Sequence, residues 1–577
     1  MKLGKKKSKK IVYEDFDMST KESRENQVLS DFGKADADKS QIKVKWDEFK
    51  DYYDGECYSK AELIDYAQKF GSDFIPPVLP DARIQVESQI EVVVPTFEFK
   101  GREASDDDKA EEREDLVNYI LYRNEIDVLN YENERPRLTF GDSFIKASFD
   151  GNAITQDGTQ GEIVLGNPHP FNIFPDPSAY KIDDCEFFIY AFPMSIRKAK
   201  RIYPEAEWDR ITPTGNAIQT ENYSEDISLD DTLQIMEYWY KDEEGDIACS
   251  ILIEGVEVKW IEKYWLTTKD SGNKSYPFIK FPNVFKSKSF WDDSEIAPIM
   301  DLIDAGNREL MTSLLNSMYM GNDIIMADKG AFADGDEPTN EPGSIWNIQP
   351  GKTVRRLGGV TNNSNAIATI SFIHEKIQET NGNFATKGQE PERVTTASGY
   401  ALLREDRKER ATMKNRPRIE AFKRLAKLID WSALEFYDDE RVITIRGDTD
   451  EDEPKEVKYK SSNYKKGEYF PPVDIIVNSG EGIAHSKVMT LTILENLLKV
   501  QITPQNAPFV KIYLDLLDVP NTEKLKKEID TMIGYSAPDD SKVDEIFNTM
   551  SDAEKQRFAG LSEDQQNVAM QKMMEGK

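Results

Sequence analysis

The sequence predicts an α+β protein built from several subdomains. Three observations support this class. Apolar residues recur at helical spacing over residues 46–135 and 294–437. Short β-branched and aromatic runs alternate with turn residues over 138–290, and similar runs return over 441–478. A chain of 577 residues has room for roughly three or four domains.

The beginning of the chain predicts a flexible arm followed by helices. Residues 1–45 are polar, start with a cluster of lysines and contain few apolar side chains, which is typical of an arm without a fixed fold. Order is expected to begin near Trp46. A second aromatic-rich helix is expected over 60–70. A long helix is predicted over 106–135, because Pro136 should stop it.

The region from 138 to 290 predicts antiparallel strands. Its longest apolar run, Phe187 to Phe192, has the length of a strand. Hairpin turns are expected at Asp150-Gly151, Asp157-Gly158 and Glu254-Gly255. Residues 167–177 contain four prolines and predict a rigid extended crossing, because each proline biases the preceding residue away from helix.

The clearest helix is predicted over residues 294–320. Ser294 fits its N-cap and Pro298 its first turn. One apolar stripe runs along this helix, and Gly306 and Asn307 interrupt it. These features predict a helix that packs one face against the rest of the protein.

The next part of the chain predicts a return path. A short strand excursion over 323–357 is followed by a second helix over 365–381. A polar stretch over 382–396 has no periodicity. A long helix is then expected over 398–437, and Pro417 should kink or split it.

Composition excludes several classes of protein. The chain has 106 acidic and 74 basic side chains, a net charge of −32, so its surface as a whole repels nucleic acid phosphates. Three cysteines and three histidines, widely spaced, argue against a disulfide scaffold and against a cysteine or histidine metal site. No apolar run approaches the roughly 18 residues of a membrane helix, and no secretion signal is expected.

Motifs of enzyme chemistry are missing from the sequence. Gly351-Lys-Thr353 matches the end of a phosphate-binding loop, but Trp346 stands where the first glycine belongs, and strand-like residues follow. The segment therefore predicts a turn into a strand. Neither GxSxG nor HExxH occurs. We expect a structural or binding protein, not an enzyme, and no cofactor or metal.

One basic segment contrasts with the acidic average. From Ser398 to Asp430 ten basic and five acidic residues give a net charge of +5. One interpretation is a helix paired with acidic neighbours. The other is a contact to nucleic acid or to an acidic partner surface. The ten basic residues are Arg404, Arg407, Lys408, Arg410, Lys414, Arg416, Arg418, Lys423, Arg424 and Lys427.

The order of these segments resembles the portal, or head–tail connector, proteins of tailed bacteriophages. The resemblance rests on residues 281–296 leading into a helix, on 301–310 within it, and on Ile345 to Gly351 in the strand excursion. It also rests on Ala397-Ser-Gly-Tyr-Ala-Leu402 at the start of the long helix and on Asn172-Ile-Phe-Pro-Asp-Pro177 upstream. It covers roughly residues 45–500.

The resemblance implies a portal fold with a β-rich wing, a helical stem hairpin, a small α/β clip, a long wing-crossing helix and a helical crown. Carried over by position, the parts are the arm 1–45, the wing 46–293 and 398–481, the stem helices 294–320 and 365–382, the clip 321–364, the tunnel loop 383–397, the crown 482–550 and the tail 551–577.

The implied function is a ring of twelve copies at one capsid vertex, through which double-stranded DNA passes during packaging and ejection. The implied partners are the terminase large subunit, the major capsid and scaffolding proteins, and head-completion, adaptor or tail proteins, without a membrane. The protein would be made in the host cytoplasm and end in the virion. The tunnel-loop candidates are Thr386, Lys387, Gln389, Glu390 and Arg393.

The basic helix has a place in this interpretation. A ring needs two different complementary faces on each subunit. Our hypothesis is that Arg404, Arg407, Lys408, Arg410 and Lys414 meet an acidic surface of the neighbouring copy or face DNA. Two alternatives remain: another virion structural protein of the capsid or tail, and a metal-dependent nucleic-acid enzyme that uses scattered carboxylates.

Overall fold

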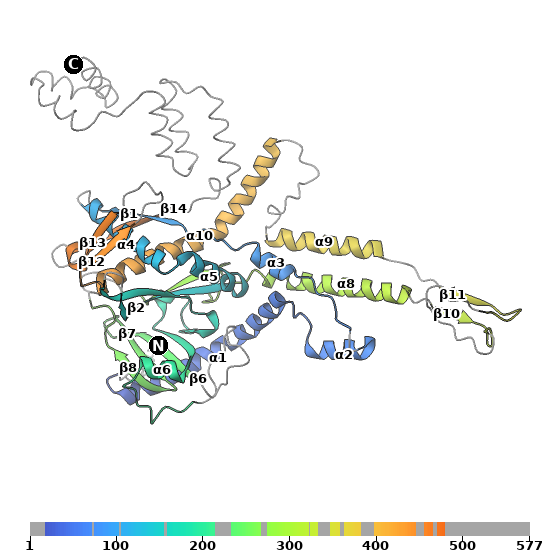
Figure 1. Cartoon of the computed structure of the whole chain (residues 1–577), viewed down its shortest axis with the longest axis horizontal. Coiled ribbons are helices and arrows are strands. Elements are labelled where there is room, and N and C mark those ends of the chain that lie inside the picture. The colour runs from blue at the N-terminus through green and yellow to red at the C-terminus, as the bar shows by residue number, and fades with distance from the viewer. Residues whose placement is uncertain are drawn as a thin grey trace, which may run out of the picture. The chain divides into compact units, whose positions relative to one another are not determined.

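The chain divides into two units, Met1–Val477 and Asn478–Lys577. The computed structural model describes residues 18–71, 74–102, 106–154, 158–213, 232–266, 274–321, 324–332, 347–357, 363–381, 397–445, 455–465 and 470–478. The first unit is therefore the one described below (Figure 1). The predicted tunnel loop, crown and tail lie outside these residues.

A five-stranded antiparallel sheet forms one layer of the first unit. Its order is β4-β5-β6-β7-β8, and neighbouring strands pair in register, with Ile189 opposite Tyr238. Most residues of β4 to β7 are buried on both faces, which explains why these strands are largely apolar, whereas β8 at the edge exposes Lys259 and Trp260. The strands are β4 (Ile173–Pro175), β5 (Phe187–Ser195), β6 (Thr232–Lys241), β7 (Ile247–Ile253) and β8 (Val256–Ile261). The predicted turn at Glu254-Gly255 is confirmed, with positive φ at both residues.

Helix α1 (Lys21–Asp54) covers one face of this sheet, so the prediction of a flexible arm over 1–45 is wrong from residue 21 onward. Thr20 caps the helix and Gly55 ends it in the left-handed conformation. Val28 and Ala35 pack into an apolar cluster with residues of β4 to β7. Arg24 donates to both carboxylate oxygens of Glu257, each at 2.7 Å. The helix was missed because much of its buried face is polar.

Lys39 shows how a charged residue of α1 becomes part of the core. Its ammonium is buried and donates to the carbonyls of Pro170, Phe171 and Ile173 at 2.6–2.8 Å. It also lies 4.1 Å from the ring centre of Phe174. Burial lowers the pKa of Lys39. The carbonyls of the proline-rich crossing thus obtain their donor from α1.

A second layer contains the three-stranded sheet β3-β2-β9 and the helices beside it. The predicted helix over 106–135 is two helices, because Glu125 adopts a left-handed conformation between them. Pro136 does not stop the second helix but lies inside it. The predicted turn at Asp150-Gly151 is also wrong, since β2 continues through it with a register shift. The elements are α4 (Asp107–Arg123), α5 (Ile126–Phe140), β2 (Asp142–Ile154), β3 (Gln160–Gly166) and β9 (Phe278–Pro282).

Helix α10 (Ala397–Phe436) crosses this layer and contacts α4, β2 and β9. It is one helix through Pro417, so of the two predicted effects the split does not occur. Figure 1 shows α10 bent between a part along the core and a part that rises from it, in agreement with the predicted kink. Its buried apolar residues lie in the main core. They are Ala421, Phe422, Leu425, Ala426, Leu428, Ile429, Ala433 and Leu434. Inside that core Arg113 of α4 binds Asp430, with Nε 2.8 Å from Oδ1.

Three small sheets and several helices complete the described chain. The strands pair as β1 (Thr96–Gly101) with β14 (Val473–Asn478), β10 (Ile324–Ala327) with β11 (Val354–Leu357), and β12 (Arg441–Ile445) with β13 (Lys455–Tyr459). The helices are α2 (Lys60–Phe70), α3 (Asp81–Glu87), α6 (Ile196–Ile202), α8 (Met300–Gly321) and α9 (Asn363–Asn381). The mixed α+β class is therefore confirmed.

The packing of α1 predicts a large difference between two adjacent residues. Val28 is fully buried, whereas Leu29 is 46% exposed. Val28→Asp should lower the free energy of unfolding by about 3–5 kcal/mol, because it places an unpaired carboxylate between helix and sheet. Leu29→Asp, the matched control, should change it by less than about 1 kcal/mol. Chemical denaturation measures both, and equal effects would contradict the docking of α1.

Candidate functional site

Two helices joined by a β-hairpin form the most distinctive part of the described chain. Helices α8 and α9 lie side by side, and β10 and β11 pair beyond the end of α8 and before the start of α9 (Figure 1). Ile303 and Met311 of α8 and Ala366, Ile373 and Ile377 of α9 are buried. We call α8, α9 and the β10–β11 hairpin the stem hairpin.

The break in the apolar stripe of α8 has a structural cause. A Cβ at Gly306 would lie 2.8 Å from Leu79 Cδ1 and 3.5 Å from Ile373 Cγ2. The side-chain oxygen of the buried Asn307 accepts the Leu79 backbone N–H at 2.8 Å. Gly306 and Asn307 therefore make the place where the segment before α3 crosses α8.

Helices α1 and α3 hold the base of the stem hairpin through polar contacts. Tyr52 donates to Asp304 of α8 at 2.6 Å. Asp81 of α3 lies 2.8 Å from Nδ1 of His374 on α9. Tyr53 donates to Glu87 of α3, and burial together with this bond raises the pKa of Tyr53 to about 12. The Tyr53 hydroxyl thus stays a donor at neutral pH.

The junction before α8 is fixed by backbone contacts to the end of α5. The prediction that Ser294 caps α8 is wrong, because a 3₁₀ turn (Ala297–Ile299) precedes the helix. Instead its hydroxyl donates to Thr139 O at 2.5 Å and accepts from Ile296 N at 3.0 Å. Gly141 has a φ of 96°, and a Cβ there would lie 2.2 Å from Asp292 O. Any side chain at this position would displace the junction.

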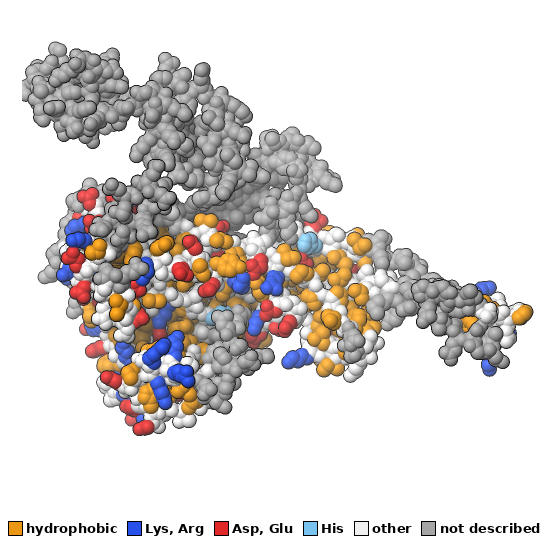
Figure 2. All heavy atoms as spheres, in the orientation of Figure 1, with side chains coloured by type: hydrophobic (Ala, Val, Ile, Leu, Met, Phe, Trp, Pro, Cys, Tyr) orange, Lys and Arg blue, Asp and Glu red, His pale blue; other side chains and the backbone are white. Residues whose placement is uncertain are grey.

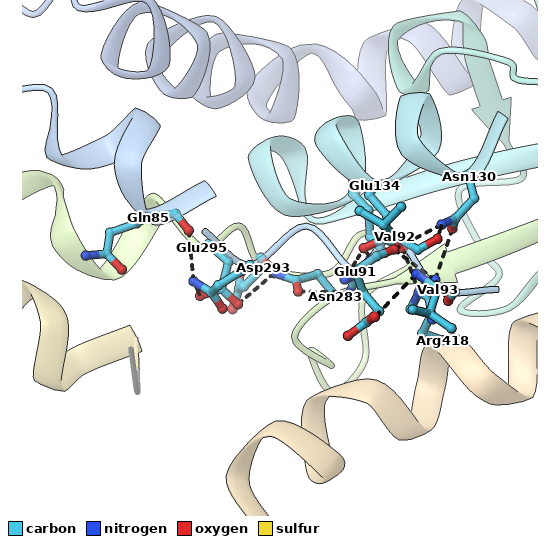
Figure 3. A network of polar contacts seen from close by, with 12 residues as sticks. Gln85, Glu91, Val92, Val93, Asn130, Glu134, Asn283, Asp293, Glu295 and Arg418 are labelled. Carbon is cyan, nitrogen blue, oxygen red and sulfur yellow. Dashed lines mark hydrogen bonds and ion pairs between the residues drawn. The ribbon is translucent and has the colours of Figure 1, made fainter. Parts of the chain in front are cut away.

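A buried polar network begins at this junction (Figure 3). Glu295 accepts from Asn283 at 3.2 Å and from Gln89 at 3.3 Å. Asn283 also donates to Asp293 O at 3.2 Å and accepts from Arg137 of α5 at 3.2 Å. Glu295, two residues before the 3₁₀ turn that leads into α8, is thereby connected to α5.

The network continues from α5 to α10. Arg137 donates to Oε2 of Glu134 at 2.6 Å, and Arg418 donates to Oε1 of the same carboxylate at 2.8 Å. Arg418 further donates to the carbonyls of Glu91 and Val93 and to Asn130 at 2.9–3.1 Å. Glu134 is completely buried, so its charge depends on these two guanidinium groups. We call these side chains the base network: Gln89, Asn130, Glu134, Arg137, Asn283, Glu295 and Arg418.

Part of the surface near the stem hairpin is apolar and uncovered. Helix α2 buries none of its residues against the described chain, and its Ile64 is 59% exposed. On α9, Ile367 is 64% and Phe372 56% exposed. Figure 2 shows hydrophobic side chains gathered over α2 and α8. An uncovered apolar surface of this kind is typical of an interface with another protein.

The comparison with known families agrees with this geometry. The model of the phage P22-like portal protein family matches residues 35–577. The chain belongs to this family. No curated protein matches it.

Family membership gives the chain its general role. It is a portal protein, a structural component of the portal vertex in DNA packaging and ejection, and not an enzyme. The family implies an oligomeric ring and an association with DNA. The match begins inside α1 and reaches residue 577, so it extends beyond the range of about 45–500 that the sequence resemblance covered.

The predicted contact residues of the portal protein stay predictions. Thr386, Lys387, Gln389, Glu390 and Arg393 lie outside the described residues. The structure describes only the backbone, as part of α10, for five further candidates, and their side chains lie outside the described part. They are Arg404, Arg407, Lys408, Arg410 and Lys414. Of the basic residues farther along α10, Arg418 is paired inside the base network, while Arg416, Lys423 and Lys427 are exposed.

The sequence analysis missed most of the base network. Asn130, Glu134 and Arg137 recur at helical spacing on the buried face of α5. That spacing was visible in the sequence, but polar residues at helical spacing more often mark a face in water. Within the described residues, no three His, Cys, Asp or Glu side chains converge as a metal site, and no helix is long and apolar enough to cross a bilayer.

The base network predicts that Arg418 matters far more than its neighbour. Arg418→Met should lower the free energy of unfolding by about 3–5 kcal/mol, because Glu134 keeps a buried charge with one partner fewer. Arg416→Met on the same helix removes an exposed guanidinium and should cost less than about 0.5 kcal/mol. Thermal unfolding of both variants measures the difference. Equal costs would mean that the base network is not formed.

Proposed function

We propose that twelve copies of the chain form a closed ring at one capsid vertex and that DNA moves through its centre. The stem hairpin of each copy lines the channel beside that of its neighbours. The observation that carries this proposal is the stem hairpin itself, held at its base by α1, α3 and the base network. Paired helices fixed at one end are suited to packing side by side around an axis.

The parts of the ring follow from the position of each segment. Residues 294–320 and 365–382 form the stem helices, 321–364 the clip, 383–397 the tunnel loop, 46–293 and 398–481 the wing, 482–550 the crown and 551–577 a tail. The described chain supports the stem and clip limits, since α8 ends at Gly321 and α9 begins at Asn363.

Ring closure needs two different faces that fit each other. One such face is the uncovered side of α2 and α8, with Ile64 and Leu314, and the other is the outer side of α9, with Ile367 and Phe372. We assign the contact between copies to these two faces. The basic residues of α10 from Arg404 to Lys414 supply a second contact, with an acidic surface of the neighbour or with DNA.

The charge of the ring suits passage of DNA without tight binding. Each copy has a net charge of −32, which repels the duplex. Lys387 and Arg393 in the tunnel loop, with Thr386, Gln389 and Glu390, supply a few weak contacts that do not depend on sequence. The ring can therefore guide DNA while the DNA slides.

The clip is the docking site for other proteins of the particle. Met326 in β10 and Ile348, which bridges to Phe332, are 51% and 46% exposed. We expect the terminase large subunit to bind the clip during packaging and head-completion, adaptor or tail proteins to replace it later. The major capsid and scaffolding proteins are the expected partners of the wing.

The proposed contact between copies predicts a clear effect on assembly. Ile64→Asp and Ile367→Asp, each alone, should convert the ring into smaller species, because each places a carboxylate in one half of every contact. Native mass spectrometry measures the number of copies. Val128→Asp, on an exposed residue of α5, is the control and should leave a ring near twelve copies.

Mixing the two variants tests the pairing of the faces. The Ile64→Asp variant keeps an intact α9 face, and the Ile367→Asp variant keeps an intact α2–α8 face. These two faces can pair once, so an equal mixture should yield dimers of the two variants and no closed ring. Full rings from either variant alone would contradict the assignment of these faces. A wild-type chain that stays a monomer at high concentration with scaffolding protein would contradict the ring.

The basic start of α10 gives a separate prediction. Arg407→Glu with Arg410→Glu should abolish ring assembly, because the reversed charges repel the acidic surface of the neighbour. Lys423→Glu with Lys427→Glu reverses two exposed charges farther along the same helix and should leave assembly intact. Sedimentation velocity measures both. An intact ring in the first variant would contradict a role of these residues between copies.

A further inference from the structure

Helix α6 (Ile196–Ile202) carries a dense group of positive charges in an acidic chain. Arg197, Lys198, Lys200 and Arg201 are all exposed, and Ala199 between them is fully buried. Figure 2 shows basic side chains gathered where Figure 1 labels α6. The chain as a whole has a net charge of −32, so this cluster is a local exception.

The fold presents these four side chains on one face. Helix α6 packs on β5 and β6 of the five-stranded sheet, and Ser195 caps its start by accepting from Lys198 N at 3.4 Å. Ala199 points inward. At 3.6 residues per turn the four basic positions lie within an arc of about 160° on the opposite side. The sheet therefore fixes the backbone and leaves the charges free to meet a ligand.

Within the described residues, no ion pair joins any of these four side chains to a carboxylate. The nearby acidic residue Glu207 is already paired with Lys21 at 2.7 Å and with Arg210 at 2.7 Å. Lys200 lies 5.3 Å from the ring centre of Trp208. Glu205 and Asp209 are exposed nearby, so the cluster is not isolated from negative charge, but basic residues dominate the helix itself.

Folding of α6 does not call for all four charges. Lys200 and Arg201 in the last turn interact favourably with the helix dipole. Arg197 and Lys198 in the first turn face its positive end, where a cation is unfavourable for the helix. Positive charge at that end, without a carboxylate partner in the described chain, indicates an external anion.

We infer that the α6 cluster binds the phosphate backbone of double-stranded DNA on the side of the five-stranded sheet, apart from the duplex between the stem hairpins. Interfaces with nucleic acid are polar and strongly positive. Protein interfaces have an apolar centre and few lysines. Helix α6 exposes four cations and a single apolar residue, Ile202, which favours DNA over an acidic protein. The inference rests on the role of the family in DNA packaging.

Closed circular DNA gives a direct test on the full-length assembly. A closed duplex cannot thread a closed ring, so its binding reports the surface outside the channel. Arg197→Gln, Lys198→Gln, Lys200→Gln and Arg201→Gln are combined in one variant. If each charge neutralises one phosphate, the slope of log affinity against log salt concentration should be less steep by about 3–4 in this variant than in the wild type. The α6-dependent binding of the wild type should fall roughly 100-fold between about 50 and 200 mM salt.

The control removes the same charge elsewhere. Lys45→Gln, Lys259→Gln, Lys288→Gln and Lys423→Gln neutralise four exposed, scattered lysines and should keep the wild-type slope. Equal losses in both variants would overturn the inference, since general charge would then explain binding. Unchanged binding in the α6 variant would overturn it too and would point to an acidic protein or to the acidic segment 214–231 as the ligand.

The ring proposal is checked in the same samples. The native mass of both variants should equal that of the wild type, because neither set of residues belongs to the proposed contact between copies. A wild-type assembly that is not a ring would contradict the proposed function. The inference on α6 would still be decided by comparing the salt dependence of DNA binding in the α6 variant and in the control variant.

Discussion

The buried carboxylate of Glu134 is the constraint on which the arrangement around the stem hairpin depends. It is completely inaccessible to water and lies between Arg137 of its own helix and Arg418 of α10. A buried charge of this kind persists only with well-placed partners. Because its two partners come from α5 and α10, the position of one helix fixes the other. Through Arg137 and Asn283 the same constraint reaches Glu295, two residues before the turn into α8.

Polar contacts at the base differ physically from the apolar contact along the stem. Apolar packing between α8 and α9 has no preferred direction and tolerates small sliding movements. Hydrogen bonds weaken steeply when their geometry changes. The start of α8 therefore cannot shift without breaking bonds to Glu295 or moving α5 and α10 with it. This explains why a network that contributes little net stability can still hold the start of α8 in one position.

The sequence predicted those elements whose buried residues are apolar. The second stem helix, the end of the first and the turn at Glu254-Gly255 lie within two residues of their predicted positions, whereas α8 begins six residues later than predicted. Helix α1 did not, because Arg24 and Lys39 lie on its buried face. Their partners are Glu257 and the carbonyls of 170–173, more than a hundred residues away. No local pattern shows whether a charged residue will meet such a partner.

The break within 106–135 and the continuity of α10 through Pro417 have the same origin. Nothing local marks Asn124 as a break, yet its side chain donates to Ile163 O and accepts from Leu165 N of β3, and the chain turns there. Pro417 removes a backbone donor, yet α10 continues, because Arg418 and the core residues after it hold the helix in place. In both cases a tertiary contact outweighs a local preference of about 1–3 kcal/mol. The candidate site follows the same rule: its charged residues gain a role only through partners that the fold supplies.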